Sequence, residues 1–425
     1  MIIVSQAYLS RIADDKLKLL LATSGGVLIV GPKWCGKTRT AEEASNSFLY
    51  MQDPDNSTAY RLLADTMPSK LLDGETPRLI DEWQVSPILW NAIRFAIDQR
   101  RQRGQFILTG SVVPPETSDM HTGTGRISRM IMRTMSLFES GESSGTISLK
   151  DLFNDQNVSF AESELTIERL AFAMTRGGWP EAVNEQNEKY ALQMVYNYLD
   201  AVANQDMSNI DGIKRNSDRV YSLLRSIARN VSTQATTSTL LGDLAVNDES
   251  LSDKTIKDYL NALHNLYVIE DLRAWSPHLR SKRGIRTTAK RHFIDPSIAT
   301  AALRADSARL LNDFKSFGYL FESLCIRDLR IYADNLDGTV YHYRDQLNFE
   351  VDAIIQLKDE RWAAIEIKMG AGEIEKAADN LLKFSNNIDT EKMQAPSFLM
   401  VLTATKHAFK LKNGVWVVPI SCLRN

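Results

Sequence analysis

The sequence predicts an α/β protein of three domains, which its length and two changes of residue pattern support. A chain of 425 residues corresponds to about three domains of roughly 150 residues each. Short apolar runs alternate with helical stretches over residues 1–160, helical spacing dominates residues 161–305, and strand-like runs return over residues 306–425. We therefore expect a parallel sheet covered by helices, then a helical domain, then a mixed α/β domain.

The composition excludes several classes of protein. Apolar residues make up 44% of the chain and charged residues 24%, as in soluble proteins with filled cores. The net charge of −3 means that any contact with nucleic acid must come from a local patch. No apolar run approaches the roughly 18 residues that span a bilayer, and the start lacks a secretory signal, so we expect a cytoplasmic protein without membrane contact. Three distant cysteines predict neither a disulfide framework nor a zinc site: Cys35, Cys325 and Cys422.

In the first domain, four short apolar runs predict strands that are buried on both faces. They are Val27–Val30, Ser47–Met51, Arg78–Asp81 and Phe106–Thr109. Glycine, proline or charged residues bound the runs, and helical stretches separate them. This pattern is typical of a parallel sheet with helices on its faces.

A phosphate-binding loop, or P-loop, follows the first of these runs. The motif G-x-x-x-x-G-K-[ST] is complete here, with the residues Gly31, Pro32, Lys33, Trp34, Cys35, Gly36, Lys37 and Thr38. A helix-compatible stretch begins at Arg39, so backbone N–H groups of the loop and of the helix N-terminus would surround the phosphates of a nucleotide. We expect residues 31–39 to bind ATP, with Lys37 near the β- and γ-phosphates and the Thr38 hydroxyl as a ligand of Mg²⁺. The alternative is a glycine-rich turn of an ordinary α/β protein.

An acidic pair at the end of the third run supplies the second part of a nucleotide site. Asp81 would hold Mg²⁺ through water, and Glu82 would polarise the attacking water, so that hydrolysis as well as binding is available. Thr109 and Ser111, at the end of the fourth run, either sense the γ-phosphate or simply cap the strand. Arg126 either contacts the nucleotide of a neighbouring copy, which would require a homo-oligomer, or lies on a solvated surface.

With these motifs in this order, the first domain resembles the AAA-type P-loop ATPases. More narrowly, the chain is similar to a widespread prokaryotic family in which such an ATPase is joined to a C-terminal domain of unknown function, and whose biological role is mostly unassigned. Further matching segments lie at Met135–Glu139, Arg176–Ala182 and Phe293–Ser297. The resemblance covers nearly the whole chain and implies ATP and Mg²⁺ as cofactors.

The middle domain contains a predicted helix-turn-helix and a basic run. Ser252 caps a helix whose apolar face comprises Ile256, Leu260, Leu263 and Tyr267. Polar residues elsewhere on this helix would face the major groove of DNA: Lys254, Lys257, Asn261 and His264. Residues 278–292 contain six basic residues and no acidic one, which a winged helix would place on its wing against phosphates. The other interpretation is a solvated hairpin or a protein contact.

The C-terminal domain places acidic residues on predicted strands. Asp352 lies in one strand-like run, and Glu366 and Lys368 share one face of the next, because alternate side chains of a strand point the same way. Such a group forms a hard oxygen site that suits Mg²⁺, which would activate water for attack on a phosphodiester. Glu322, on an amphipathic helix over Phe317–Tyr332, would supply a third carboxylate.

This set resembles the PD-(D/E)xK restriction-endonuclease-like fold, with Glu322 as the helix acid, Asp352 as the first strand acid, and Glu366 and Lys368 as the E-x-K pair. Val351 stands where a proline commonly precedes the first acid. The resemblance implies a magnesium-dependent nuclease core, or a retained but inactive core that only binds DNA or a partner.

Two functions therefore compete. The first is an ATP-hydrolysing, DNA-associated protein whose nuclease-like domain cuts or grips nucleic acid. The alternative is a nucleotide-switched regulator or scaffold that binds DNA or protein without cleaving it. A small-molecule kinase is disfavoured, because the pair Asp81-Glu82 indicates water as the acceptor.

Overall fold

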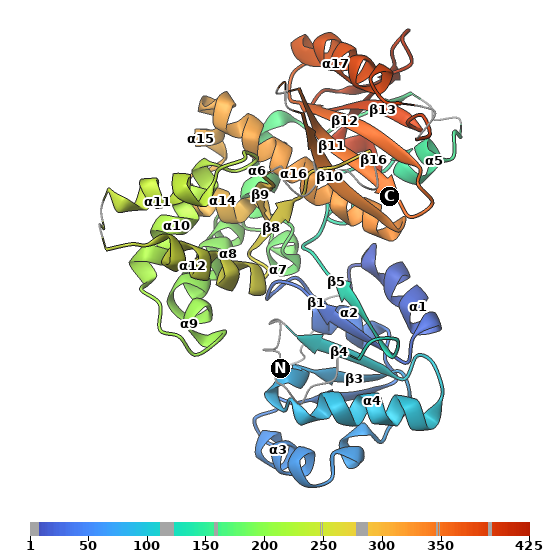
Figure 1. Cartoon of the computed structure of the whole chain (residues 1–425), viewed down its shortest axis with the longest axis vertical. Coiled ribbons are helices and arrows are strands. Elements are labelled where there is room, and N and C mark those ends of the chain that lie inside the picture. The colour runs from blue at the N-terminus through green and yellow to red at the C-terminus, as the bar shows by residue number, and fades with distance from the viewer. Residues whose placement is uncertain are drawn as a thin grey trace. The chain divides into compact units, whose positions relative to one another are not determined.

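Figure 1 shows a computed structural model of the chain. It describes residues 8–110, 123–156, 160–246, 248, 250–277, 288–345, 347, 349–389 and 393–425. The chain divides into two compact units, the first made of Met1–Thr134 with Asn265–Tyr267 and the second of Met135–His264 with Val268–Asn425. None of the helices in the described ranges combines the length and the hydropathy that a membrane span requires.

The first unit is built around a five-stranded parallel sheet, which contains the four strands that the sequence predicts and a fifth, β5, that it does not. Its strands are β1 (Gly26–Val30), β2 (Ser47–Tyr50), β3 (Arg78–Asp81), β4 (Phe106–Gly110) and β5 (Ile127–Ile131). Their order is β2-β3-β4-β1-β5, and all neighbouring strands are parallel. The carboxyl ends of β1, β4 and β3 therefore lie side by side at one edge of the sheet.

Helices cover both faces of this sheet. They are α1 (Ala13–Thr23), α2 (Lys37–Glu43), α3 (Ser57–Thr66) and α4 (Ile88–Arg100), with short 3₁₀ turns η1 (Pro68–Leu72) and η2 (Trp83–Val85). Successive residues of β1 enter different hydrophobic cores. Leu28 packs in the core that contains Ile97 of α4, whereas Ile29 packs in the core that contains Leu17 of α1. Burial on both faces explains why β1 is uniformly apolar.

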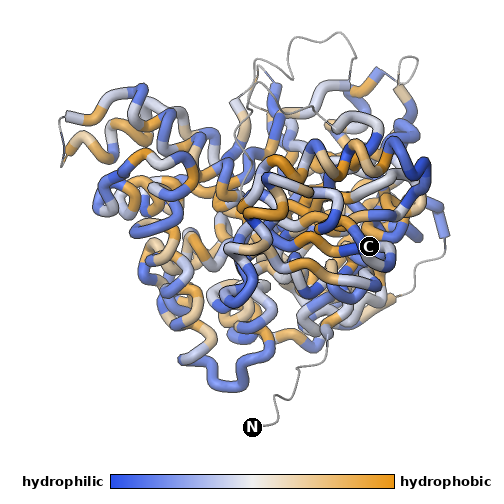
Figure 2. Tube along the Cα trace, turned by 90° about the horizontal axis from the view of Figure 1, so that it is seen from below, coloured by the Kyte–Doolittle hydropathy of each residue, from blue (hydrophilic) through white to orange (hydrophobic). Residues whose placement is uncertain are grey.

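The second unit contains a helical part. Its helices are α6 (Ile167–Arg176), α7 (Pro180–Asn184), α8 (Glu188–Ala201), η3 (Val202–Asp206), α9 (Met207–Asn209), α10 (Ser217–Arg229), α11 (Thr237–Ala245), α12 (Asp253–Asn265), α14 (Pro296–Leu303) and α15 (Ser307–Asn312). An antiparallel hairpin of β8 (Ile269–Leu272) and β9 (Lys290–Phe293) follows α12. The predicted apolar face of α12 is buried at Ile256, Leu260 and Leu263. Hydrophobic and hydrophilic stretches alternate along these helices (Figure 2), as expected when one face is buried.

The C-terminal part of the second unit is a mixed sheet with two long helices. Its elements are α16 (Phe314–Asn335), β10 (Gly338–Arg344), β11 (Glu350–Leu357), β12 (Trp362–Lys368), η4 (Ala371–Glu373), α17 (Ile374–Asn386), β13 (Phe398–Thr403), β14 (His407–Lys410), β15 (Trp416–Pro419), η5 (Ile420–Cys422) and β16 (Leu423–Arg424). The sheet order is β10-β11-β12-β13-β15-β14-β7. β10, β11 and β12 are antiparallel, and β12, β13 and β15 are parallel. The strand-like runs predicted around Asp352 and Glu366 are present as β11 and β12.

A segment that the sequence assigns to the first domain packs in the second unit. β6 (Ile147–Ser148) pairs with β16 near the end of the chain and leads into α5 (Leu149–Phe153). β7 (Ala161–Glu162) pairs with β14. The division at Thr134 therefore precedes the predicted boundary at residue 160, because strand pairing ties this segment to the C-terminal sheet.

Candidate functional site

The P-loop joins β1 to α2 through a backbone that needs glycine at two positions. At Gly31 (φ 152°) a Cβ atom would lie 2.1 Å from the backbone oxygen of Met132, so no side chain fits. Gly36 directly precedes α2 with φ 97°, a conformation that residues with a Cβ rarely adopt. Gly31 is thus required by the close approach of the segment after β5, and Gly36 by the conformation of the loop itself.

The ammonium group of Lys37 lies against this loop. Its Nζ donates hydrogen bonds to the backbone oxygens of Gly31 at 3.1 Å and of Pro32 at 2.7 Å, and the residue is 6% exposed. The positive charge is therefore held beside the loop N–H groups, which together form the kind of site that binds phosphate.

Hydrogen bonds connect the start of α2 with the ends of β3 and β4. The Thr38 hydroxyl donates to Asp81 Oδ1 at 2.8 Å, and the Thr109 hydroxyl donates to the same oxygen at 2.5 Å. Thr109 Oγ1 also accepts from the backbone N–H of Glu82 at 3.3 Å. Thr109 reaches both acids because β4 is the direct neighbour of β3. The structure thus brings together four of the predicted site residues.

Glu82 follows β3 with a left-handed backbone conformation, φ 52°. The side-chain amide of Gln84 donates a hydrogen bond to Glu82 Oε2. Burial raises the pKa of Glu82, and the charge of Asp81 raises it further, while Lys37 acts in the opposite direction. A raised pKa brings a carboxyl group closer to the range in which a general base works at neutral pH. Gln84 is not among the predicted site residues, although it belongs to the segment 79–84 that matches the resembled ATPase family.

The donor groups at this edge of the sheet fit a magnesium–nucleotide complex. The Thr38 hydroxyl and the Asp81 carboxylate are hard oxygen donors within 2.8 Å of each other. Mg²⁺ is usually bound by one or two protein oxygen ligands of this kind, and its other ligands are water molecules and phosphate oxygens. The P-loop and Lys37 supply the complementary groups for phosphates.

The other predicted loop residues differ in exposure. Lys33 and Trp34 are exposed on the loop, and Trp34 has φ 73°. Cys35 is fully buried, and its thiol donates to the backbone oxygen of Met132 at 3.5 Å, so its side chain packs beneath the loop. Ser111 lies outside the described residues.

The two predicted arginines lie in ion pairs. Arg39 pairs with Glu43 at 2.8 Å on the surface of α2. Arg126 pairs with Asp98 at 2.9 Å and directly precedes β5, whose first residue is level with the first residue of β1. Arg126 therefore lies at the amino edge of the parallel sheet, opposite the P-loop edge. The structure does not bring it to the nucleotide site of its own chain.

Arg11, which belongs to none of the sequence motifs, forms hydrogen bonds that stabilise the P-loop. Its guanidinium donates to the backbone oxygens of Cys35 at 2.8 Å and of Arg133 at 2.9 Å. Arg11 is buried, so these bonds lie largely out of water. They tie the loop to the segment that follows β5.

A cluster of acids and lysines, hereafter the acid cluster, forms in the C-terminal sheet around the predicted residues Asp352, Glu366 and Lys368. Lys368 Nζ lies 3.0 Å from Asp352 Oδ2 and 2.8 Å from Glu366 Oε2. Asp352 Oδ2 also accepts from the backbone N–H of Ile367 at 2.8 Å. Asn380 of α17, which was not predicted, donates to Glu366 Oε1 at 2.6 Å. The predicted convergence of these strand residues is thus present.

Glu322 of α16 joins the acid cluster through a lysine from another element. Lys290 of β9 lies 2.9 Å from Glu322 Oε1 and 3.9 Å from Asp352 Oδ1. The sequence places Lys290 in the basic run expected to face DNA. The structure corrects this, because the Lys290 side chain is only 6% exposed and points to buried acids.

Several other described residues of the predicted DNA-binding surface also contact acids, among them Lys257, which lies 2.6 Å from Asp253. Arg291, the last basic residue of the run, pairs with Asp271 at 3.3 Å. His264 of α12 lies 3.5 Å from the same carboxylate. Residues 278–287 of the run lie outside the described residues.

Burial and charge act together on the acid cluster. Burial raises the pKa values of Glu322 and Glu366, whereas the ammonium groups of Lys368 and Lys290 outweigh burial and lower the pKa of Asp352. Among the described residues, no group of three or more His, Cys, Asp or Glu side chains is placed to hold a metal ion. Lysines already contact the carboxylates that the sequence predicts as Mg²⁺ ligands, so a metal ion would have to displace an ammonium group to reach them.

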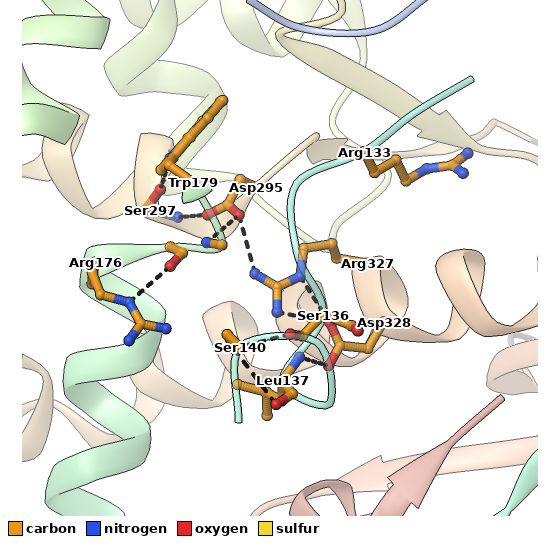
Figure 3. A network of polar contacts seen from close by, with 12 residues as sticks. Arg133, Ser136, Leu137, Ser140, Arg176, Trp179, Asp295, Ser297, Arg327 and Asp328 are labelled. Atoms are coloured by element: carbon orange, nitrogen blue, oxygen red, sulfur yellow. Dashed lines mark hydrogen bonds and ion pairs between the residues drawn. The ribbon is translucent and has the colours of Figure 1, made fainter. Parts of the chain in front are cut away.

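The downstream segments that resemble family signatures meet in a buried ionic network (Figure 3). Arg327 of α16 lies 3.0 Å from Asp295 Oδ2 and 2.7 Å from Asp328 Oδ1, and all three side chains are at most 2% exposed. Asp295 also accepts from the backbone N–H of Gly178 at 3.0 Å. Asp328 accepts from the backbone N–H of Leu137 at 3.0 Å. One guanidinium thus connects segments that lie far apart in the chain.

Three family models match separate parts of the chain. Residues 24–140 match a model described as an AAA domain. Residues 167–309 match a domain of unknown function, DUF8612, and residues 317–423 match another, DUF4143. The P-loop, Asp81, Glu82 and Thr109 all fall within the first match. The first unit therefore contains a P-loop domain of the AAA class.

Comparison with curated proteins gave no match. Among solved structures, the Walker-type ATPase PABY2304 of Pyrococcus abyssi is 15% identical, with a TM-score of 0.43, over 70% of this chain and 97% of that chain. AMPPCP-bound DnaA from Aquifex aeolicus is 13% identical, with a TM-score of 0.27, over 60% of this chain and 84% of that one. At these TM-scores the likenesses add nothing to the assignment, which depends on the family match.

Proposed function

We propose that the chain is a magnesium-dependent ATP hydrolase. The observation that carries this proposal is the hydrogen-bonded set of Thr38, Asp81, Glu82 and Thr109 beside the P-loop. Binding of a nucleotide alone would not require a second, half-buried carboxyl group next to Asp81. Glu82, with its raised pKa, is such a group.

Each of these side chains has a defined part in the proposed reaction. Lys37 and the loop N–H groups bind the β- and γ-phosphates. Thr38 and Asp81 hold Mg²⁺, which when bound offsets negative charge on the phosphates. Glu82 accepts a hydrogen bond from the attacking water and takes its proton. Thr109 holds Asp81 and the backbone of Glu82, so that the acidic pair keeps its orientation.

Replacement of the loop lysine tests the proposal. We expect Lys37→Ala to lower ATP hydrolysis by roughly 100-fold or more, because the loop loses a buried positive charge aimed at the phosphates. Phosphate release is measured with and without duplex DNA, and stimulation by DNA is expected in the wild type only. Lys70→Ala, at a lysine whose side chain is 60% exposed, is the matched control. Hydrolysis by Lys37→Ala at the wild-type rate would contradict the proposal.

We further propose that the protein associates with DNA and that its C-terminal part is a nuclease-like core of the PD-(D/E)xK type. The support is that the helix acid, the strand acid and the E-x-K pair of that resemblance come together in one cluster. The helices α10, α11 and α12 followed by the hairpin β8–β9 support a winged helix.

A cleavage assay separates this proposal from binding alone. With Mn²⁺ and supercoiled plasmid, we expect Asp352→Ala and Lys368→Ala to reduce nicking by roughly 100-fold or more, because each removes part of the acid cluster. ATP hydrolysis is expected to persist, since these residues lie in the other unit. Asp359→Ala, at an exposed carboxylate in the turn between β11 and β12, is the control. Unchanged nicking in both variants would remove the cluster as the nuclease site.

The second candidate function is a nucleotide-switched regulator that binds DNA or protein without cutting. The observation that favours it is that Lys290 and Lys368 already neutralise the acids of the cluster. A wild-type protein that hydrolyses ATP but leaves the plasmid intact under all metal conditions would support this candidate.

A further inference from the structure

Lys290 is a cation that enters the acid cluster from outside the strands that carry its acids. It belongs to β9 of the hairpin, whereas Glu322 lies on α16 and Asp352 on β11. Its ammonium lies 2.9 Å from the Glu322 carboxylate and 3.9 Å from that of Asp352. A second lysine, Lys368, contacts both Asp352 and Glu366. Every carboxylate of the cluster therefore faces an ammonium group.

The position of Lys290 is set by secondary structure. β9 pairs with β8, and Lys290 is level with Leu272 in this hairpin. Alternate residues of β9 point the same way, so Lys290 and His292 are both buried. His292 Nδ1 lies 3.3 Å from the Ser323 hydroxyl, beside Glu322 on α16. Pairing with β8 and the contact of His292 with Ser323 therefore fix the strand from which Lys290 reaches the acids.

We propose that the Lys290 ammonium occupies the acid cluster in place of a metal ion and prevents divalent metal ions from binding there. A divalent ion must approach carboxylate oxygens to about 2.0–2.6 Å, and the Lys290 ammonium, hydrogen-bonded to Glu322 and in an ion pair with Asp352, repels it and occupies its place. Metal binding then requires that Lys290 leaves Glu322. This inference rests on the proposed nuclease-like core and concerns how its site is regulated.

Metal titration of the full chain tests the inference. Mn²⁺ binding is measured by calorimetry without nucleotide, in a Thr38→Val background that weakens the P-loop metal site. We expect Lys290→Gln to bind Mn²⁺ about tenfold or more tightly than the Thr38→Val parent, because a competing charge is gone. Lys290→Arg, which keeps a cation, is expected to bind as weakly as the parent. Lys358→Gln, at a lysine whose side chain is 78% exposed, is the matched control.

The outcomes separate this inference from the proposed nuclease-like core. Equal, tight binding by the parent and by Lys290→Gln would overturn the inference and leave the nuclease-like core standing. A failure of both to bind Mn²⁺ would overturn the inference together with metal-dependent cleavage.

A second measurement applies to the wild type and does not depend on the folding of a variant. An acylating reagent that labels exposed amines should leave Lys290 unmodified without metal and label it once Mn²⁺ saturates the protein. Labelling is read by mass spectrometry, with Lys358 as an internal reference for an exposed amine. Protection of Lys290 that persists with metal bound at the cluster would overturn the inference.

Discussion

Replacing Glu82 with glutamine is expected to lower the steady-state rate of ATP hydrolysis by roughly 100-fold or more and to leave ATP binding intact. Glutamine keeps the size of the side chain and still accepts a hydrogen bond, but it cannot take a proton from water. The groups proposed to bind the phosphates and Mg²⁺, namely Lys37, Thr38 and Asp81, are untouched. The variant should therefore accumulate in the ATP-bound state.

The measurement pairs phosphate release with nucleotide binding by calorimetry on the same preparation. Glu75→Gln, at an exposed carboxylate of the first unit, is the matched control and should behave as the wild type. An unchanged hydrolysis rate in Glu82→Gln would exclude Glu82 as the general base. Loss of ATP binding instead of turnover would indicate that Glu82 supports the architecture of the site.

Replacing Arg327 with methionine is expected to destabilise the second unit by about 3–5 kcal/mol. Methionine fills much of the same volume, but the carboxylates of Asp295 and Asp328 are completely buried and would lose their guanidinium partner. A buried charge without a partner destabilises the folded state, whereas in the intact pair the attraction between opposite charges offsets the cost of removing them from water. The loss is measured as a shift of the urea unfolding transition. Arg309→Met, at an exposed arginine of α15, should stay within about 0.5 kcal/mol of the wild type.

The pH dependence of this effect has a definite sign. Burial already raises the pKa of Asp328 from 3.8 to about 6 in the wild type, and removal of Arg327 raises it further. A folded state that binds the proton more tightly than the unfolded state gains stability as the pH falls. We therefore expect Arg327→Met to be less destabilising at pH 5 than at pH 8. A penalty that grows toward low pH would contradict the assigned network.

Local patterns were sufficient to predict the parallel sheet and the core of the nucleotide site. The P-loop motif is local in the chain, and the left-handed backbone at Gly36 accounts for one of its glycines. The alternation of side chains along a strand likewise put Glu366 and Lys368 together. Uniformly apolar runs indicated strands buried on both faces, and β1 is such a strand.

Only the tertiary structure decided what the charged residues contact. Lys290 is one of six basic residues in a run, and nothing near it in the chain indicates that it pairs with Glu322. Arg126 was expected either to contact the nucleotide of a neighbouring copy or to lie on the surface, and only the parallel pairing of β1 with β5 places it at the edge opposite the P-loop, beside Asp98. The physical reason is the same in both cases. A sequence pattern specifies local conformation and polarity, whereas the partner of a charged side chain is supplied by elements that only long-range topology brings together.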